Sequence, residues 1–220
     1  IPGIYSAQCI ITTDIDNNQI TSFYPGAMGE AHQNRVTDAD NVTLGIVAPD
    51  GRQGMIQHAD EFSSLNTPFL FDPGQNLRLF SKDELLNFVE TATWLIMNNY
   101  ESHLLLDIVG GTLQEYASSL DALIVTLGNE GSLIYHSGTV LQIPSVKIAQ
   151  TLDPTGCGDA YRAGILHGLN NGWDWEQTGQ VASLIGALNA EQHGTQNHRY
   201  GHSELEARYK NAFGGSYPAV

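Results

Sequence analysis

The run of residues best equipped for chemistry is a glycine-rich turn that leads into a helical segment, at residues 152–159. Two glycines flank one small residue there, so the backbone N–H groups of Gly156, Cys157 and Gly158 can point at one anion, with a helix dipole behind them. Asp159 follows in the first helical turn, where the positive end of that dipole stabilises a carboxylate. A carboxylate beside an anion cradle can deprotonate a hydroxyl while a phosphoryl group is transferred to it.

The same run also has a purely structural interpretation. Glycine-rich loops often only turn the chain into a helix, and Asp near a helix start is a common stabiliser. Spacing alone supports the two interpretations about equally. Two other phosphate loops are excluded, because no Lys follows the glycines and Tyr161 stands where the third glycine of G-x-G-x-x-G belongs.

The surrounding elements indicate an α/β protein. Short apolar strands alternate with segments of helical period, which favours right-handed crossovers and a mostly parallel sheet. The strands are predicted at residues 42–48, 68–71, 93–97 and 122–126, and the helices between them include 51–65 and 81–90. Further strands are predicted at 132–136, 139–143 and 145–149 as an antiparallel edge, followed by helices at 157–169, 175–191 and 203–213.

The N-terminal part predicts a separate hairpin. Residues 8–13 and 20–24 are rich in β-branched and aromatic residues, and the turn-forming cluster at 14–18 separates them. We expect the hairpin and its return into the core to occupy residues 1–30, and the α/β body to occupy residues 31–220.

The composition is that of a folded, acidic protein. Hydrophobic residues make up 41% of 220, enough for a sizeable core. A net charge of -15, from 9 Lys and Arg against 24 Asp and Glu, argues against nucleic acid polymers or an anionic membrane as the main partner. No apolar run approaches the roughly 18 residues of a membrane span. Cys9 and Cys157 are too few for a disulfide framework, so a cytoplasmic location is expected.

Several motifs resemble the ribokinase, or PfkB, family of carbohydrate and nucleoside kinases. The run from Asp153 to Asp159 is similar to the family's second signature, D-T-x-G-A-G-D. Residues 98–101 fit its N-x-x-E motif, residues 126–131 fit its T-x-G-x-x-G motif, and residues 13–28 look like the lid hairpin of bacterial adenosine-kinase-like members. The resemblance implies a ribokinase-like fold, with helices on both faces of a mostly parallel sheet and a small β lid.

For the glycine-rich turn, the resemblance implies specific roles. Asp159 would be the catalytic base that takes the proton of the acceptor hydroxyl, and Gly156, Cys157 and Gly158 would form the anion hole. Cys157 replaces the usual Ala and leaves the backbone donors intact. Its thiol is either a small filler or, at a helix N-terminus, an acidic and redox-sensitive group.

The resemblance also implies metal and nucleotide contacts. Asn98 and Glu101 would organise Mg²⁺ and its waters, although without the family match they could equally be a polar helix cap. Asp153 matches a position that holds a monovalent cation in several members, with K⁺ as the candidate, while other members do without that ion. Arg162 shares a helix face with Asp159, and a surface ion pair is favoured over a phosphate contact. The implied ATP-binding residues are Thr126, Gly128, Gly131, Ser183, Ala187 and Gly194.

Together these features predict an ATP-dependent phosphotransferase that acts on a hydroxymethyl group, with adenosine to AMP, a purine salvage reaction, as the leading assignment. A ribokinase- or fructokinase-like sugar kinase and an inactive nucleotide-binding or interaction module remain open alternatives. The family's acceptor-binding strand and glycine-pair motif are not found in these residues, so the sequence is expected to be the later two thirds of a kinase of roughly 300 residues. Exposed hairpin strands predict pairing into a homodimer.

Overall fold

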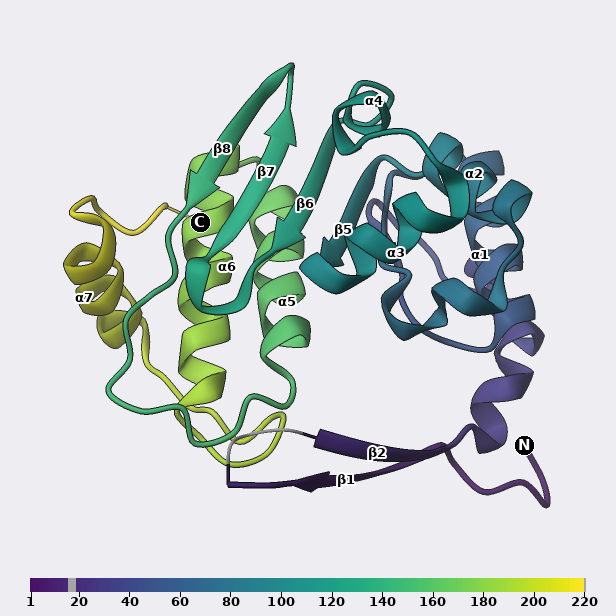
Figure 1. Ribbon diagram of the computed structural model, residues 1–220, viewed down its shortest axis with the longest axis horizontal. Helices are drawn as coiled ribbons and strands as arrows, with labels where there is room; N and C mark the ends of the chain where they lie inside the picture. Colours follow the sequence, from purple (N-terminus) through teal and green to yellow (C-terminus); the bar gives the residue numbers. More distant parts are fainter. Residues whose placement is uncertain (16–18, 220) are drawn as a thin grey trace. The chain divides into compact units, whose positions relative to one another are not determined.

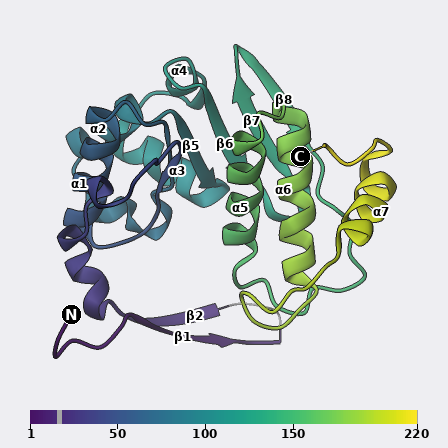
Figure 2. The ribbon, with the colours of Figure 1, turned by 180° about the vertical axis from the view of Figure 1, so that it is seen from behind.

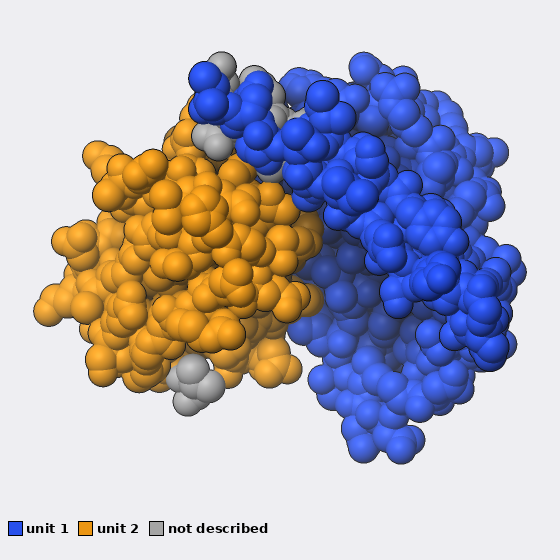
Figure 3. Space-filling view, turned by 90° about the horizontal axis from the view of Figure 1, so that it is seen from below, with its two compact units in different colours: residues 1–126, 135–139 blue, residues 127–134, 140–220 orange. Residues whose placement is uncertain are grey.

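The computed structural model describes residues 1–15 and 19–219. Its chain divides into two compact units, coloured separately in Figure 3. Unit 1 comprises residues 1–126 and 135–139, and unit 2 comprises residues 127–134 and 140–220.

Unit 1 is built on a parallel ladder of buried strands (Figure 1). These strands are β3 (Gly45–Val47), β4 (Phe69–Phe71), β5 (Trp94–Asn98) and β6 (Ala122–Thr126). Each pairs with the next in parallel register, and β5 and β6 are buried along almost their whole length. Continuous apolar strands of this kind are typical of a parallel sheet that helices cover, and this confirms the predicted α/β class.

The helices of unit 1 are α1 (Arg52–Ser64), α2 (Lys82–Thr91), α3 (Asn99–Val109) and α4 (Leu113–Ala117), with the 3-10 helices η1 (Gly26–Gln33), η2 (Val36–Asp38) and η3 (Gly74–Leu79). Helices α1, α2 and α3 contribute buried residues to the core of unit 1, whereas α4, η1 and η2 have none. Phe88 of α2 stacks on Phe71 of β4 with ring centroids 4.4 Å apart, and Phe80 meets Phe88 edge-on at 5.0 Å. The core of unit 1 therefore fixes the positions at which β5 and β6 end.

The predicted N-terminal hairpin is confirmed. Strands β1 (Gln8–Thr13) and β2 (Gln19–Tyr24) pair antiparallel, from Gln8 opposite Tyr24 to Thr13 opposite Gln19. All six residues of β1 are exposed. The predicted turn at 14–18 includes residues 16–18, which lie outside the described residues.

Unit 2 carries the long C-terminal helices. Its elements are η4 (Gly128–Glu130), most of β7 (Ser132–His136) and β8 (Thr139–Ile143), α5 (Cys157–Asn170), α6 (Trp175–Ala190) and α7 (His202–Phe213). Helices α5 and α6 lie side by side and α7 packs beside α6, as Figures 1 and 2 both show. A Cβ at Gly164 of α5 would lie only 2.5 Å from the Cα of Ala182, so a glycine there allows the close approach of α5 and α6.

The larger sheet of the described residues has six strands, in the order β3-β4-β5-β6-β7-β8. The strand predicted at 145–149 is wrong, because that stretch has no ladder partner among the described residues. Its start is anchored by side chains: Ser145 Oγ donates to the carbonyl of Asn129, and Ser183 Oγ donates to the carbonyl of Pro144. Pro144 also lacks an N–H for a ladder. The predicted domain boundary at residue 30 stays a prediction. By its contacts, the hairpin belongs to unit 1.

Candidate active site

The glycine-rich turn forms the start of α5 in unit 2. Gly156 is the N-cap, with φ of 85° in the left-handed region and no side-chain cap. A Cβ at this position would also lie 3.0 Å from Thr195, so only glycine fits without strain. The first N–H groups of a helix have no intrahelical partner, although Cys157 N donates to the Pro154 carbonyl over a long 3.3 Å. This helix start therefore has the geometry of an anion site.

Asp153 supports the turn from the side of the preceding loop. Its Oδ1 accepts the N–H of Thr155 and its Oδ2 accepts the N–H of Gly194, each at 2.9 Å. The bonds from Gly194 and then Thr155 hold the pKa of Asp153 below its ordinary value. Asp153 and Gly194, which the sequence singled out for separate reasons, are thus brought together by the fold.

Asp159 lies one residue beyond the glycines, in the first turn of α5. Its side chain is 76% exposed and forms an ion pair with Arg162, three residues later on the same helix. The ion pair that the sequence favoured for Arg162 is therefore present. An exposed carboxylate beside a helix N-terminus is within reach of a bound ligand, as a general base requires.

Cys157 is a half-buried thiol and not an acidic one. Burial raises its pKa, and the hydrogen bond from Asn189 offsets only part of that rise. The small-filler interpretation is therefore favoured over an acidic thiol, because desolvation opposes formation of the thiolate.

Asn189, near the end of α6, was missed by the sequence analysis. It is fully buried, and its Nδ2 donates to the carbonyl of Thr155 at 2.9 Å and to Sγ of Cys157 at 3.5 Å. The available signal was a lone amide inside the apolar run 184–190. A buried amide needs hydrogen-bond partners, and the turn at the start of α5 supplies them.

In unit 1, Asn98 and Thr126 meet at the carboxyl ends of their strands. They are register partners at the ends of β5 and β6. Asn98 Oδ1 accepts the N–H of Glu101, and Glu101 Oε2 accepts the N–H of Asn98, both at 2.8 Å. The capping box that the helix-cap interpretation predicts is therefore present in the structure.

This oxygen pair has the chemistry of a Mg²⁺ site that keeps several waters. Mg²⁺ typically uses one or two carboxylates together with water and phosphate oxygens. Within residues 1–15 and 19–219, no group of three or more His, Cys, Asp or Glu side chains could enclose a metal. Asn98 and Glu101 fit an ion held mainly by water and nucleotide, so the Mg²⁺ assignment stays a prediction.

The T-x-G-x-x-G segment is a closed turn. Leu127 N donates to the Gly131 carbonyl at 2.8 Å, and Gly131 N donates to the Gly128 carbonyl at 3.1 Å. Gly131 has φ of 91°, and a Cβ there would lie 2.0 Å from the Ile143 carbonyl oxygen. In α6, Ser183 is buried and Ala187 is half-buried. The ATP contacts expected of these residues stay predictions.

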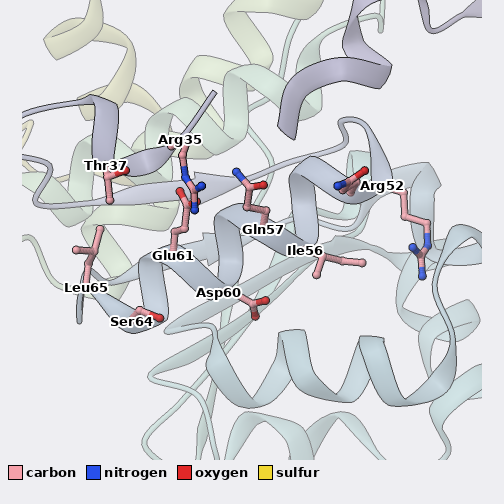
Figure 4. Close-up of a pocket in the computed structure, with 10 residues that line it drawn as sticks. Arg35, Thr37, Arg52, Ile56, Gln57, Asp60, Glu61, Ser64 and Leu65 are labelled. Carbon is pink, nitrogen blue, oxygen red and sulfur yellow. The ribbon is translucent and has the colours of Figure 1, made fainter. Parts of the chain in front are cut away.

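A large hollow lies elsewhere, on the outer side of α1 (Figure 4). It measures about 540 Å³, and two arginines line it. Arg35 pairs with Glu61 at 2.6 Å, and Arg52 pairs with Glu84. Because carboxylates already neutralise both guanidinium groups, this hollow is a poorer anion site than the start of α5.

Among the described helices, none combines the length and apolar composition that a membrane span needs.

Comparison with known proteins agrees with the motifs. The chain is 46% identical to the nucleoside kinase of Burkholderia thailandensis solved with inosine, with a TM-score of 0.96 over 98% of this chain and 71% of that one. A structure of that kinase with ADP-inosine gives a TM-score of 0.95 at 45% identity, over 100% and 69% of the two chains.

A curated nucleoside kinase of Methanocaldococcus jannaschii is 34% identical over 186 residues, which is 84% of this chain. The chain spans 61% of the length of that relative. Residues 3–199 match the family described as pfkB family carbohydrate kinase. This chain belongs to the pfkB family of carbohydrate kinases.

Proposed function

We propose that the protein transfers the γ-phosphoryl group of ATP to a hydroxymethyl group of a nucleoside. The observation that carries this proposal is the start of α5, where Gly156 leaves the helix N-terminus without a side-chain cap and Asp159 stands exposed in the first turn. The Burkholderia relative was solved with inosine and with ADP-inosine, which supports a nucleoside acceptor and an adenine nucleotide.

In this mechanism, Asp159 accepts the proton of the attacking hydroxyl as the oxygen bonds to phosphorus. General-base catalysis of this kind contributes about 10²–10⁴ in rate. The N–H groups of Gly156, Cys157 and Gly158 stabilise the charge on the phosphoryl oxygens as the bond to ADP breaks, and each such donor is worth about 10²–10³. Proton transfer then restores neutral Asp159 to its carboxylate through solvent.

Two ions belong to the proposal. Asn98 and Glu101 would organise Mg²⁺, which supplies charge neutralisation of the nucleotide phosphates when it is bound. Asp153 would contribute a carboxylate oxygen to K⁺. The position of Asp153 supports this second assignment, because the N–H groups of Thr155 and Gly194 fix its carboxylate beside the turn.

The acceptor is proposed to be a purine nucleoside, with inosine and adenosine as the two leading substrates. The lid motif favours adenosine and the Burkholderia complex favours inosine. Transfer of ³²P from ATP by the natural full-length protein, with inosine, adenosine, ribose and fructose in parallel, tests the proposal. Labelled nucleoside monophosphate is expected. Labelled sugar phosphate alone would favour the sugar-kinase alternative, and no labelled product would favour the inactive module.

We also propose that the hairpin pairs with a second copy of the chain. Ile10 and Ile20 are 68% and 76% exposed, and Phe23 is 53% exposed, on two strands that have no further strand partner among the described residues. Light scattering after gel filtration should give a dimer for the parent and a monomer for Phe23→Ser. Leu65→Ser, which changes an exposed apolar residue outside the hairpin, is the matched control. An unchanged mass for Phe23→Ser would contradict this assembly.

A further inference from the structure

Asn189 is a fully buried amide on α6 that contacts the anion turn of α5 from behind. Its Nδ2 donates to the carbonyl oxygen of Thr155 at 2.9 Å. The same nitrogen donates to Sγ of Cys157 at 3.5 Å. A single side chain of α6 therefore binds residues on both sides of Gly156, the N-cap of α5.

The contact with Thr155 has a direct consequence for Gly156. The Thr155 carbonyl and the Gly156 N–H belong to one planar trans peptide group, so the two bonds point in opposite directions. A donor that holds the carbonyl oxygen therefore also sets the direction of the Gly156 N–H. Asn189 occupies the carbonyl side of this peptide and leaves the N–H side available.

Asp153 holds the neighbouring peptide, and the two supports differ. Asp153 Oδ1 accepts the N–H of Thr155, which fixes the peptide group between Pro154 and Thr155. Asn189 fixes the next peptide group, whose N–H lies at the helix start itself. Of these two supports, Asn189 acts on the N–H that faces the proposed phosphoryl group.

The second amide atom of Asn189 lowers what the residue can contribute to stability. Oδ1 of Asn189 is buried and has no hydrogen-bond partner among the described residues. A buried acceptor without a partner costs folding free energy, and an apolar side chain of similar volume would avoid that cost. Among the described residues, the hydrogen bonds of the Asn189 donor go to Thr155 and Cys157 of the anion turn.

We propose that Asn189 is a positioning residue for phosphoryl transfer, which orients the Gly156 N–H through the Thr155 carbonyl. This inference rests on the proposed function and deepens it. Because the anion hole binds charge that develops in the transition state, loss of Asn189 should reduce kcat and leave the KM for ATP nearly unchanged.

The test uses Asn189→Leu and Asn189→Asp in the natural full-length protein. Leu keeps the branched shape of Asn, with a larger volume, and has no donor. Asp removes the N–H donor, but its carboxyl can still donate an O–H when burial keeps it protonated. We expect kcat to fall about 10- to 100-fold in Asn189→Leu and by less in Asn189→Asp, with the KM for ATP within about 3-fold of the parent. Thr178→Val is the matched control, because Thr178 is an equally buried polar residue on α6 that faces Gly168. Its kcat should equal that of the parent.

A binding measurement separates positioning from a general structural defect. Calorimetric affinity for ADP with aluminium fluoride and inosine, which mimics the transferring phosphoryl group, should weaken about 10-fold in Asn189→Leu. Affinity for ADP alone should change less than about 3-fold. Equal weakening of both affinities, or an unchanged kcat in a folded Asn189→Leu protein, would overturn the inference. Asn189→Ala replaces Asn189→Leu if thermal melting shows that the Leu variant is unfolded.

The proposed function can fail separately from this inference. If the parent transfers no phosphate to any acceptor, the proposed function fails. If the parent is active and Asp159→Asn is inactive, but Asn189→Leu and Asn189→Asp turn over normally, only the role of Asn189 fails.

Discussion

The starts of α3 and α5 differ in whether a side chain caps the N–H groups of the first helical turn. At α3, Asn98 and Glu101 form a capping box in which each side chain accepts the other residue's N–H at 2.8 Å. At α5, the N-cap is Gly156, which has no side chain to accept a hydrogen bond. Both helices leave N–H groups that need acceptors, but of these two starts only that of α3 has a side-chain cap.

The comparison shows how a helix start remains available to a ligand. The turn before α5 is held by Asp153, through Thr155 N and Gly194 N, and by Asn189, through the Thr155 carbonyl. These hydrogen bonds hold the turn in place, and none of them uses the Gly156 N–H. A helix start that is rigid but uncapped is suited to bind an anion.

The largest expected effect is that of Asp159→Asn, which removes the proposed base from the uncapped helix start. Turnover should fall by about 10²–10⁴ while ATP binding persists, because an amide cannot accept the hydroxyl proton. Steady-state kinetics and ATP calorimetry measure the two quantities. Glu176→Gln, in the first turn of α6, is the control for loss of an acid near a helix start. Near-normal turnover in Asp159→Asn would sink the assigned mechanism.

Next in size is Gly156→Ala, which tests whether the uncapped start needs glycine. The Ala would have to keep the left-handed φ of 85°, and its Cβ would lie 3.0 Å from Thr195. The free energy of unfolding should fall by about 1–3 kcal/mol in urea titrations. Gly158→Ala is the comparison, because Gly158 has no left-handed φ and the nearest atom to its Cβ would be the terminal guanidinium nitrogen of Arg162 at 3.3 Å. Equal stabilities of the two variants would contradict the strain at Gly156.

A smaller effect is expected at the capped helix start, from Glu101→Gln. Gln can still serve in a capping box, so the melting temperature should stay close to that of the parent. Loss of the carboxylate should nevertheless raise the Mg²⁺ concentration needed for half-maximal activity. A Mg²⁺ titration of activity, with Glu115→Gln in the α4 capping box as control, measures this difference. An unchanged titration would leave Glu101 as a helix cap alone.

The smallest effect concerns pH and Asp153. Because the folded pKa of Asp153 lies below its ordinary value of 3.8, its stabilisation is present above that value and is lost as the pH falls through the folded pKa. Asp153→Asn should therefore lower the urea midpoint at pH 7, and the difference from the parent should shrink at about pH 3. Asp107→Asn on α3 is the control. A difference that is constant with pH would mean that the ionised carboxylate is not the cause.

Much of the fold was predictable because its signals are local. The bounds of β1, β6, β7 and β8 agree with the predicted strands, since turn residues border short apolar runs there. The start of helix α3 was predictable as a polar cap, because Asn98 and Glu101 carry the spacing of a capping box, but its end at Val109 was not predicted. The β-branched residues of 145–149 favour a strand, and they do not reveal two side-chain hydrogen bonds at its start. Ser145 Oγ donates to the Asn129 carbonyl, and Ser183 Oγ donates to the Pro144 carbonyl.

The site was predictable where its residues are contiguous and not where the fold joins distant segments. Residues 153–159 and the ion pair of Asp159 with Arg162 follow from local spacing. The contacts of Gly194 with Asp153 and of Asn189 with Thr155 join residues 41 and 34 positions apart, which spacing cannot show. Spacing left two interpretations of Cys157 open for a related reason, because the burial that raises its pKa is a property of the packed structure.

The central claim is that the N–H groups at the start of α5 bind the phosphate. Protein labelled with ¹⁵N-glycine shows the amides of Gly156 and Gly158 directly, with Gly156→Ala and Gly158→Ala to assign their resonances. Titration with a non-hydrolysable ATP analogue and Mg²⁺ should shift both amide resonances downfield to saturation and leave that of Gly172, at the far end of α5, in place. Saturating nucleotide with no change at Gly156 and Gly158 would contradict the account.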